Sequence, residues 1–145
     1  MEFAFMLLPT LGLFFIIINV AWVIFGRACL QEAVREGVRY AITGQALSGD
    51  TTFASSVQTV TQEHSFGFIP KACQVTVQFF SSSNLSSVTN PAGGDVVEVS
   101  VANIDVKPLA ALLISSAAIP LSASEADIMQ SPQGTQLQAS TPCQP

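Results

Sequence analysis

Charged side chains are scarce in this sequence, and histidine is almost absent. Only 10% of the 145 residues are charged, with ten acidic and five basic side chains, and there is one histidine. After Arg39 the only basic residues are Lys71 and Lys107. A surface that binds nucleic acid needs basic side chains along the phosphate backbone. The composition therefore argues against nucleic acid as a partner.

The same scarcity argues against catalysis and metal binding. A nucleophilic mechanism needs a serine or cysteine in contact with a base. His64 is the only histidine, and we interpret it as a solvent-facing residue at the end of a short helix. The sequence contains no Cys-x-x-Cys motif and no Gly-rich phosphate loop. We therefore expect no enzyme activity, no cofactor, no metal site and no small-molecule substrate.

What the sequence does contain is one long apolar run. Phe3–Gly26 has no charged residue, and its only polar side chains are Thr10 and Asn19. As a helix it would rise by about 36 Å, enough to cross a bilayer core of about 30 Å. A cleavable secretory signal is the alternative, but it would need a basic start, a shorter apolar core and a small-residue cleavage site. We favour a retained span or a filament helix.

The run continues without a break into an amphipathic helix. Its apolar face repeats at intervals of three and four residues and consists of Leu30, Ala33, Val34, Gly37, Val38, Ala41 and Ile42. This spacing is typical of a helix that lies on a core. Gly44 fits a C-terminal cap. We therefore expect one helix from about Phe3 to Thr43.

Two features of the apolar run bear on helix packing. Pro9 removes a backbone hydrogen bond and predicts a bend or a loosened turn. Gly12, Asn19, Gly26 and Ala33 recur every seven residues. Small and amide residues in such a line are typical of closely packed apolar helices. The alternative is that membrane helices simply tolerate glycine.

The rest of the chain predicts a small β-rich domain. Residues 51–64 have apolar residues at helical spacing, with Asp50 or Thr51 as the cap. Apolar residues alternate in Cys73–Phe80 and in Asp95–Asn103, which predicts two strands that pair antiparallel. We then expect a short apolar helix beginning near Asp105 and Pro108, a third strand around residues 119–123 and a polar tail over residues 130–145.

These elements define an α+β fold. A long N-terminal helix, residues 1–44, is expected to pack on a small antiparallel sheet domain, residues 45–145. After the helix about a hundred residues remain, which is enough for one modest core.

Two motifs lie on the long expected helix, one at each end. The chain opens with MEFAFMLLP, which contains Glu2, Phe3, Ala4 and Pro9. Near its other end the helix reads AVREGVRYA, with Arg35, Glu36, Gly37 and Arg39 in an Ala-x-Arg-Glu-Gly-x-Arg pattern. In both motifs the chain resembles the TadE-like pilus subunits, the Tad/Flp branch of the type IV pilin superfamily.

The resemblance implies a structural subunit, a pilin or minor pilin, of an extracellular filament. Such a subunit would sit in the inner membrane before assembly and would then pack against copies of itself or other pilins through its helix. Glu2 would pair with the N-terminal amine of a neighbouring subunit. From their places in the apolar run, we also expect Pro9, Gly12, Asn19 and Gly26 to contribute to assembly. The alternative is a solitary single-pass anchor that carries an extracytoplasmic binding domain.

The resemblance also bears on orientation. Arg27, Arg35 and Arg39 all follow the apolar run, and the positive-inside rule alone would place the β-rich domain in the cytoplasm. Pilin-like precursors carry a basic leader that is removed after insertion. We therefore expect a precursor that extends upstream of Met1 and a domain that faces outward.

The three cysteines fall into two groups. Cys29 lies on the long helix, where we interpret it as a small buried or lipid-proximal side chain, with lipidation as the alternative. Cys73 and Cys143 lie in the domain expected to be exported, and an oxidising compartment would favour a disulfide between them. Two independent thiols remain the alternative.

Overall fold

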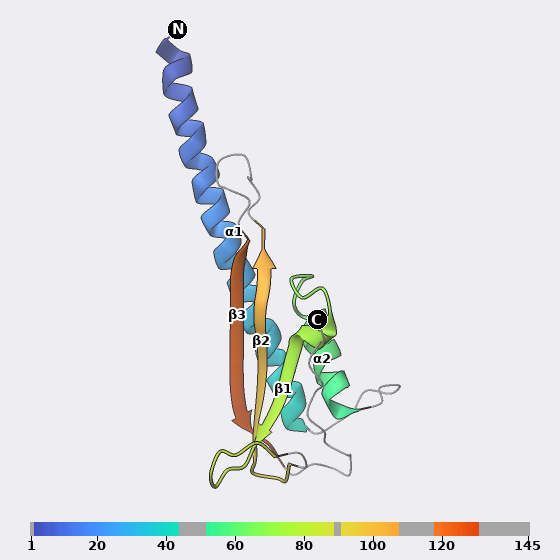
Figure 1. Cartoon of the computed structure of the whole chain (residues 1–145). Helices are drawn as coiled ribbons and strands as arrows, with labels where there is room; N and C mark the ends of the chain where they lie inside the picture. The colour runs from blue at the N-terminus through green and yellow to red at the C-terminus, as the bar shows by residue number, and fades with distance from the viewer. Residues whose placement is uncertain (1, 44–51, 89–90, 108–117, 131–145) are drawn as a thin grey trace.

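A computed structural model describes residues 2–43, 52–88, 91–107 and 118–130, without the side chains of residues 2–5 and Cys73. Figure 1 shows a long helix that extends well beyond a small sheet. The elements are α1 (Glu2–Thr43), α2 (Phe53–Glu63), the short 3₁₀ helix η1 (Ala72–Gln74), β1 (Val75–Phe80), β2 (Val96–Val106) and β3 (Ile119–Ile128). The predicted α+β fold is confirmed.

The three strands form one antiparallel sheet in the order β1-β2-β3. Val77 pairs with Val99, and Val99 pairs with Glu125 on the other side. Because side chains alternate across a strand, one face of β1 and β2 is apolar. That buried face consists of Val75, Val77 and Phe79 on β1 and Val97, Val99 and Val101 on β2. The antiparallel pairing predicted for these two strands is therefore confirmed.

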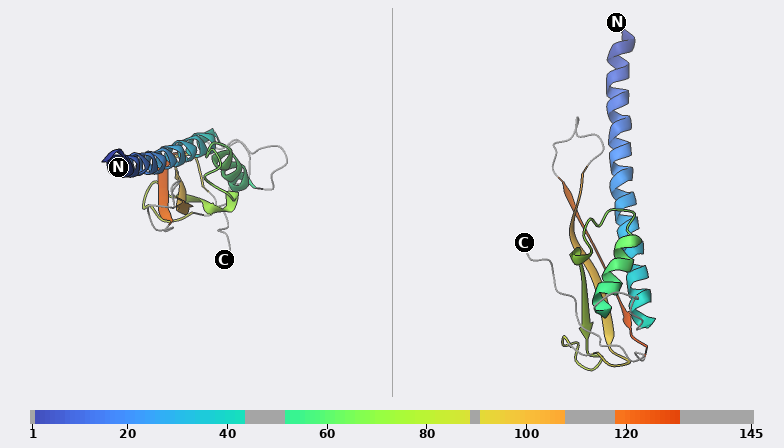
Figure 2. Two further views of the ribbon diagram at one scale, coloured as in Figure 1. Left: turned by 90° about the horizontal axis from the view of Figure 1, so that it is seen from above. Right: turned by 90° about the vertical axis from the view of Figure 1, so that its right-hand side faces the viewer.

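Both helices cover the same face of the sheet. In the view from above in Figure 2, α1 and α2 lie together on one side of the strands. The C-terminal half of α1 contributes its apolar stripe to the core, as predicted, with Leu30, Ala33, Val34, Val38 and Ala41 at most 3% exposed. From α2, Phe53 contributes a ring that lies 6.3 Å from the ring of Phe79. The second half of α1 is therefore part of the domain core.

Two side chains cap the N-terminus of α2. Thr52 is the cap: its hydroxyl accepts from the Ser55 amide at 3.3 Å, and the Ser55 hydroxyl accepts from the Thr52 amide at 3.4 Å. Two of the amides that a helix N-terminus leaves unbonded are satisfied in this way. The prediction of Asp50 or Thr51 as the cap was wrong by one or two positions.

A bulge in β2 corrects the prediction for the chain beyond Asn103. Val101 pairs with Ala123 and Ile104 pairs with Leu121, so β2 carries one more residue than β3 between these pairs. The extra residue puts Ile104 and Val106 on the buried face and leaves Asp105 exposed. Asp105 therefore belongs to a strand and does not begin a helix. The helix expected after Pro108 lies outside the described residues.

Candidate functional site

The N-terminal half of α1 is an apolar surface that the described part of the domain leaves largely open. Its exposed large apolar side chains are Met6, Leu7, Leu8, Leu11, Leu13, Phe14, Phe15, Ile16, Ile17, Ile18, Val20, Ile24 and Phe25. The run from Leu13 to Ile18 is exposed at every position, and six consecutive residues pass more than once around a helix. A helix that is apolar all round is typically surrounded by lipid or by other protein.

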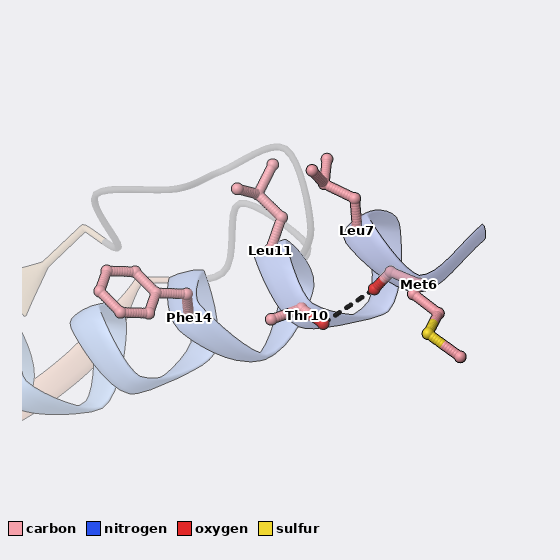
Figure 3. Close-up of a pocket in the computed structure, with 5 residues that line it drawn as sticks. All are labelled: Met6, Leu7, Thr10, Leu11 and Phe14. Atoms are coloured by element: carbon pink, nitrogen blue, oxygen red, sulfur yellow. Dashed lines mark hydrogen bonds between the residues drawn. The ribbon is translucent and has the colours of Figure 1, made fainter. Parts of the chain in front are cut away.

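Close to its start, α1 continues through Pro9. The Thr10 hydroxyl donates a hydrogen bond to the Met6 carbonyl at 2.8 Å, so the only polar side chain of this turn is satisfied within the helix (Figure 3). Met6, Leu7, Thr10, Leu11 and Phe14 line a shallow concavity of about 350 Å³. Leu7 and Leu11 point to the same side, as residues four apart do on a helix (Figure 3). The concavity fits an apolar side chain or an acyl chain rather than a polar ligand.

The line of residues spaced seven apart, Gly12, Asn19, Gly26 and Ala33, faces this chain's own domain over its later members. Asn19 is 4% exposed and Ala33 is fully buried. A Cβ on Gly26 would lie 3.0 Å from the Phe68 ring, so this glycine admits a close aromatic contact within the subunit. Gly12 has open space around it. Gly26 and Ala33 thus have an intramolecular packing role, while an assembly role for any member of the line stays a prediction.

An aromatic cluster forms where the domain meets the apolar half of α1. The ring of Phe68, from the segment after α2, lies 5.6 Å from Trp22 and 6.1 Å from Phe25. Trp22 and Phe25 are themselves 6.0 Å apart. From the sequence alone, no contact between this segment and the apolar run was predicted. The sequence feature that could have indicated the aromatic cluster is Phe66-Gly67-Phe68, in which two aromatic residues flank a glycine.

The signature residues near the end of α1 have different surroundings. Gly37 is buried against α2, and a Cβ there would overlap the Thr61 hydroxyl. Glu36 and Arg39, three residues apart on α1, form an ion pair at 3.4 Å, but the Arg39 side chain is 80% exposed. Such a surface pair contributes little to stability. The glycine of the signature is therefore the structurally demanding position.

Arg35 faces a different part of the fold. With Arg27, Gln31, Ser122 and Glu125 it lines a polar groove of about 310 Å³ between α1 and the edge strand β3. Among the described residues, neither of the two arginines has a carboxylate oxygen within 4.0 Å. The described lining of the groove carries both signs of charge.

Comparisons with protein-family models, curated proteins and solved structures gave no match. A functional inference for this chain therefore depends on its own residues and geometry.

Several predicted site residues lie partly or wholly outside the described part of the chain. Glu2 is the first described residue of α1, but its side chain is not described. The backbone of Cys73 lies in η1, while its side chain and all of Cys143 lie outside the described part. The proposed disulfide thus stays a prediction. Cys29 is a buried free thiol on α1. No cluster of metal-binding side chains occurs within the described ranges.

By length and composition, α1 qualifies as a membrane-spanning helix. Its most apolar window is only 6% buried within the chain, which separates it from the core helix of an ordinary globular protein. A signal sequence near an N-terminus can pass the same test of length and composition, although its apolar core is shorter. What distinguishes α1 is its continuation into the core of the domain.

Proposed function

We propose that this chain is a structural subunit, a pilin or minor pilin, of a filament of the type IV pilus kind. In this proposal the apolar half of α1 lies in the filament core and the sheet domain covers the outside. The observation that carries the proposal is that α1 is one helix of 42 residues, whose first half projects and whose second half is built into the domain. The TadE-like motifs on the same helix support it.

One helix, α1, forms both the projecting part and a part of the domain core, and this limits how the two parts can move relative to each other. Because Leu30, Val34 and Val38 are buried under the sheet, the domain cannot swivel freely about the projecting half. Packing the projecting helices side by side would therefore fix the positions of the domains as well. A filament needs this coupling, since each subunit must present the same outer surface at every repeat. A solitary anchor would function equally well with a flexible linker.

The energy of assembly would come from the apolar side chains. Relative to a subunit in water, burial of apolar surface stabilises by about 25 cal/mol per Å² at most. Within a bilayer the apolar half of α1 already avoids water, so transfer into a filament exchanges lipid contacts for helix contacts. Before assembly the subunit would lie in the inner membrane with its domain outward. It would then join copies of itself or other pilins in an extracellular fibre.

Photo-crosslinking between helices tests this proposal against a solitary anchor. A photoreactive amino acid replaces Leu13, which is 61% exposed on the apolar half. We expect irradiation of intact cells to give covalent dimers and higher multimers, because neighbouring subunits pack at this position. The matched control places the same amino acid at Leu85, which is 69% exposed in the segment between β1 and β2. Crosslinks to lipid alone from residue 13 would favour a solitary anchored domain.

A further inference from the structure

The segment Ser65–Pro70, between α2 and η1, holds an aromatic ring out of the fold. The Phe66 side chain is 77% exposed. Its φ is +52°, a left-handed conformation that is unfavourable for a residue other than glycine. Gly67 follows with φ +83°, where the absence of a side chain removes that cost. The segment contains no charged residue.

The ends of this segment are fixed by the core. Ser65 is fully buried and Ile69 is 1% exposed. The Phe68 amide donates to the Ser65 carbonyl at 3.0 Å, and the Ile69 amide donates to the Ser65 hydroxyl at 3.3 Å. The side chain of Gln62 donates to the carbonyls of Ile69 and Pro70, both at 3.3 Å. Phe66 is therefore held outward by a hydrogen-bonded turn.

The neighbouring ring sets the position of this turn along α1. Phe68 packs on Trp22 and Phe25, and it lies against Gly26, the last residue of the apolar run. The next residue, Arg27, is the first charged side chain after that run. In the right-hand view of Figure 2, the chain that follows α2 lies beside α1 just below its projecting half. In a bilayer spanned by the apolar run with Arg27 among the headgroups, this turn would lie at the same level.

We propose that Phe66 is a second membrane contact, which enters the boundary between headgroups and acyl chains while α1 spans the bilayer. Aromatic side chains favour this layer because it accommodates a large apolar ring next to water. The same turn reaches the exposed apolar surface of α1 through Phe68, whose ring contacts the half-exposed Phe25, and the turn itself contains no charged residue. The helix and Phe66 together hold the domain on the membrane at two points and limit its tilt and rotation before assembly.

This inference depends on insertion of α1 into a bilayer and not on filament formation, so the two can fail separately. The test uses the full chain in phosphatidylcholine vesicles with single tryptophans. Trp22, the only tryptophan, is replaced by phenylalanine, and Phe66→Trp then supplies the reporter. We expect a blue-shifted tryptophan emission. Bromine on the upper acyl chain of the lipids should quench most of its intensity, and aqueous iodide should leave it nearly unchanged.

The chain offers a closely matched control. Leu85 is 69% exposed and has φ +53°, but it lies in the segment between β1 and β2, at the other end of the sheet. Leu85→Trp in the same Trp22→Phe background is expected to respond to iodide and not to brominated lipid. Equal quenching of the two reporters by iodide would overturn the proposal. So would protection of the Phe66→Trp reporter from both quenchers, because the ring would then be covered by protein, such as a second copy of the chain.

Discussion

Gly37 of α1 and Thr61 of α2 lie so close that a Cβ on the glycine would overlap the threonine hydroxyl. Thr61 is fully buried, and its hydroxyl donates to the Val57 carbonyl at 2.8 Å, so it is held in place by its own helix. The same Cβ would also lie 3.5 Å from a methyl group of Val99. The glycine thus sets the distance at which α2 packs on α1 above the sheet.

Gly37→Ala is expected to destabilise the domain. Overpacking of a filled site costs about 1–3 kcal/mol, against a gain of about 1 kcal/mol from the better helix propensity of alanine. The free energy of unfolding of the full chain in detergent, from denaturant titration followed by circular dichroism, measures the balance. Adding Thr61→Ala removes the overlapping hydroxyl and should recover part of the loss. A gain in stability of about 1 kcal/mol in the Gly37→Ala single variant, which is the full propensity gain of alanine, would show that the helices separate without cost.

Gly12→Ala is the matched control on the same helix. Gly12 has nothing within 4 Å of a Cβ position, so only helix propensity acts there. We expect unchanged stability or a gain of up to about 1 kcal/mol in the same titration. A loss at Gly12 equal to that at Gly37 would mean that glycine flexibility, and not contact with Thr61, explains both results.

The bulge in β2 gives a prediction for Asn103. Its φ is +57°, a conformation that asparagine tolerates and that a β-branched residue does not. Asn103→Val is expected to lower the free energy of unfolding by about 1–2 kcal/mol, while Asn103→Gly should cost nothing. If both variants matched the parent chain in thermal unfolding, the strand would have an alternative register that keeps Ile104 and Val106 buried.

The elements with the strongest periodicity were predictable from the sequence. The bounds of α1, the apolar face from Leu30 to Ala41 and the antiparallel pairing of β1 with β2 follow from regular spacing of apolar residues. The bulge was not predictable, because a two-residue alternation assigns Asp105 to the buried face and so ends the strand too early. One extra residue near Asn103 shifts the pattern and extends β2 to Val106.

The apolar surface of α1 was predictable from the sequence only in part. An uncharged run such as Phe3–Gly26 identifies an apolar helix, but spacing alone does not say what each face of it touches. The line of small residues suggested contacts between subunits, whereas Gly26 contacts Phe68, a residue far away in the sequence. Contacts of this kind depend on how the domain folds back on the helix, so the local spacing of residues does not predict them.

Glu2→Ala is expected to impair assembly while the domain stays folded. A carboxylate at the edge of an apolar segment is costly unless it is paired or reaches water, and the family resemblance supplies the N-terminal amine of a neighbour as its partner. The yield of sheared fibres should fall, with circular dichroism of the purified subunit unchanged. An unaltered fibre yield would indicate a carboxylate that simply reaches the aqueous interface.

The Cys73–Cys143 disulfide remains a prediction that chemistry can settle directly. Closing a loop of about seventy residues would stabilise the domain by about 4 kcal/mol in the chain-entropy model. Mass mapping of the protein under non-reducing conditions, after alkylation of free thiols, should recover one crosslinked peptide pair and a modified Cys29. Alkylation of all three cysteines without prior reduction would rule the bridge out.

Electron microscopy of material sheared from cells that produce this chain, with gold-labelled antibody against the sheet domain, tests directly whether it is a filament subunit. We expect regular thin fibres that carry the label along their whole length or at defined places, and their loss when the gene is deleted. We also expect Leu13→Lys to abolish labelled fibres, since the charge would enter a packed apolar core. Label confined to membrane fragments, with no labelled fibres, would contradict a filament subunit and leave a solitary anchored domain.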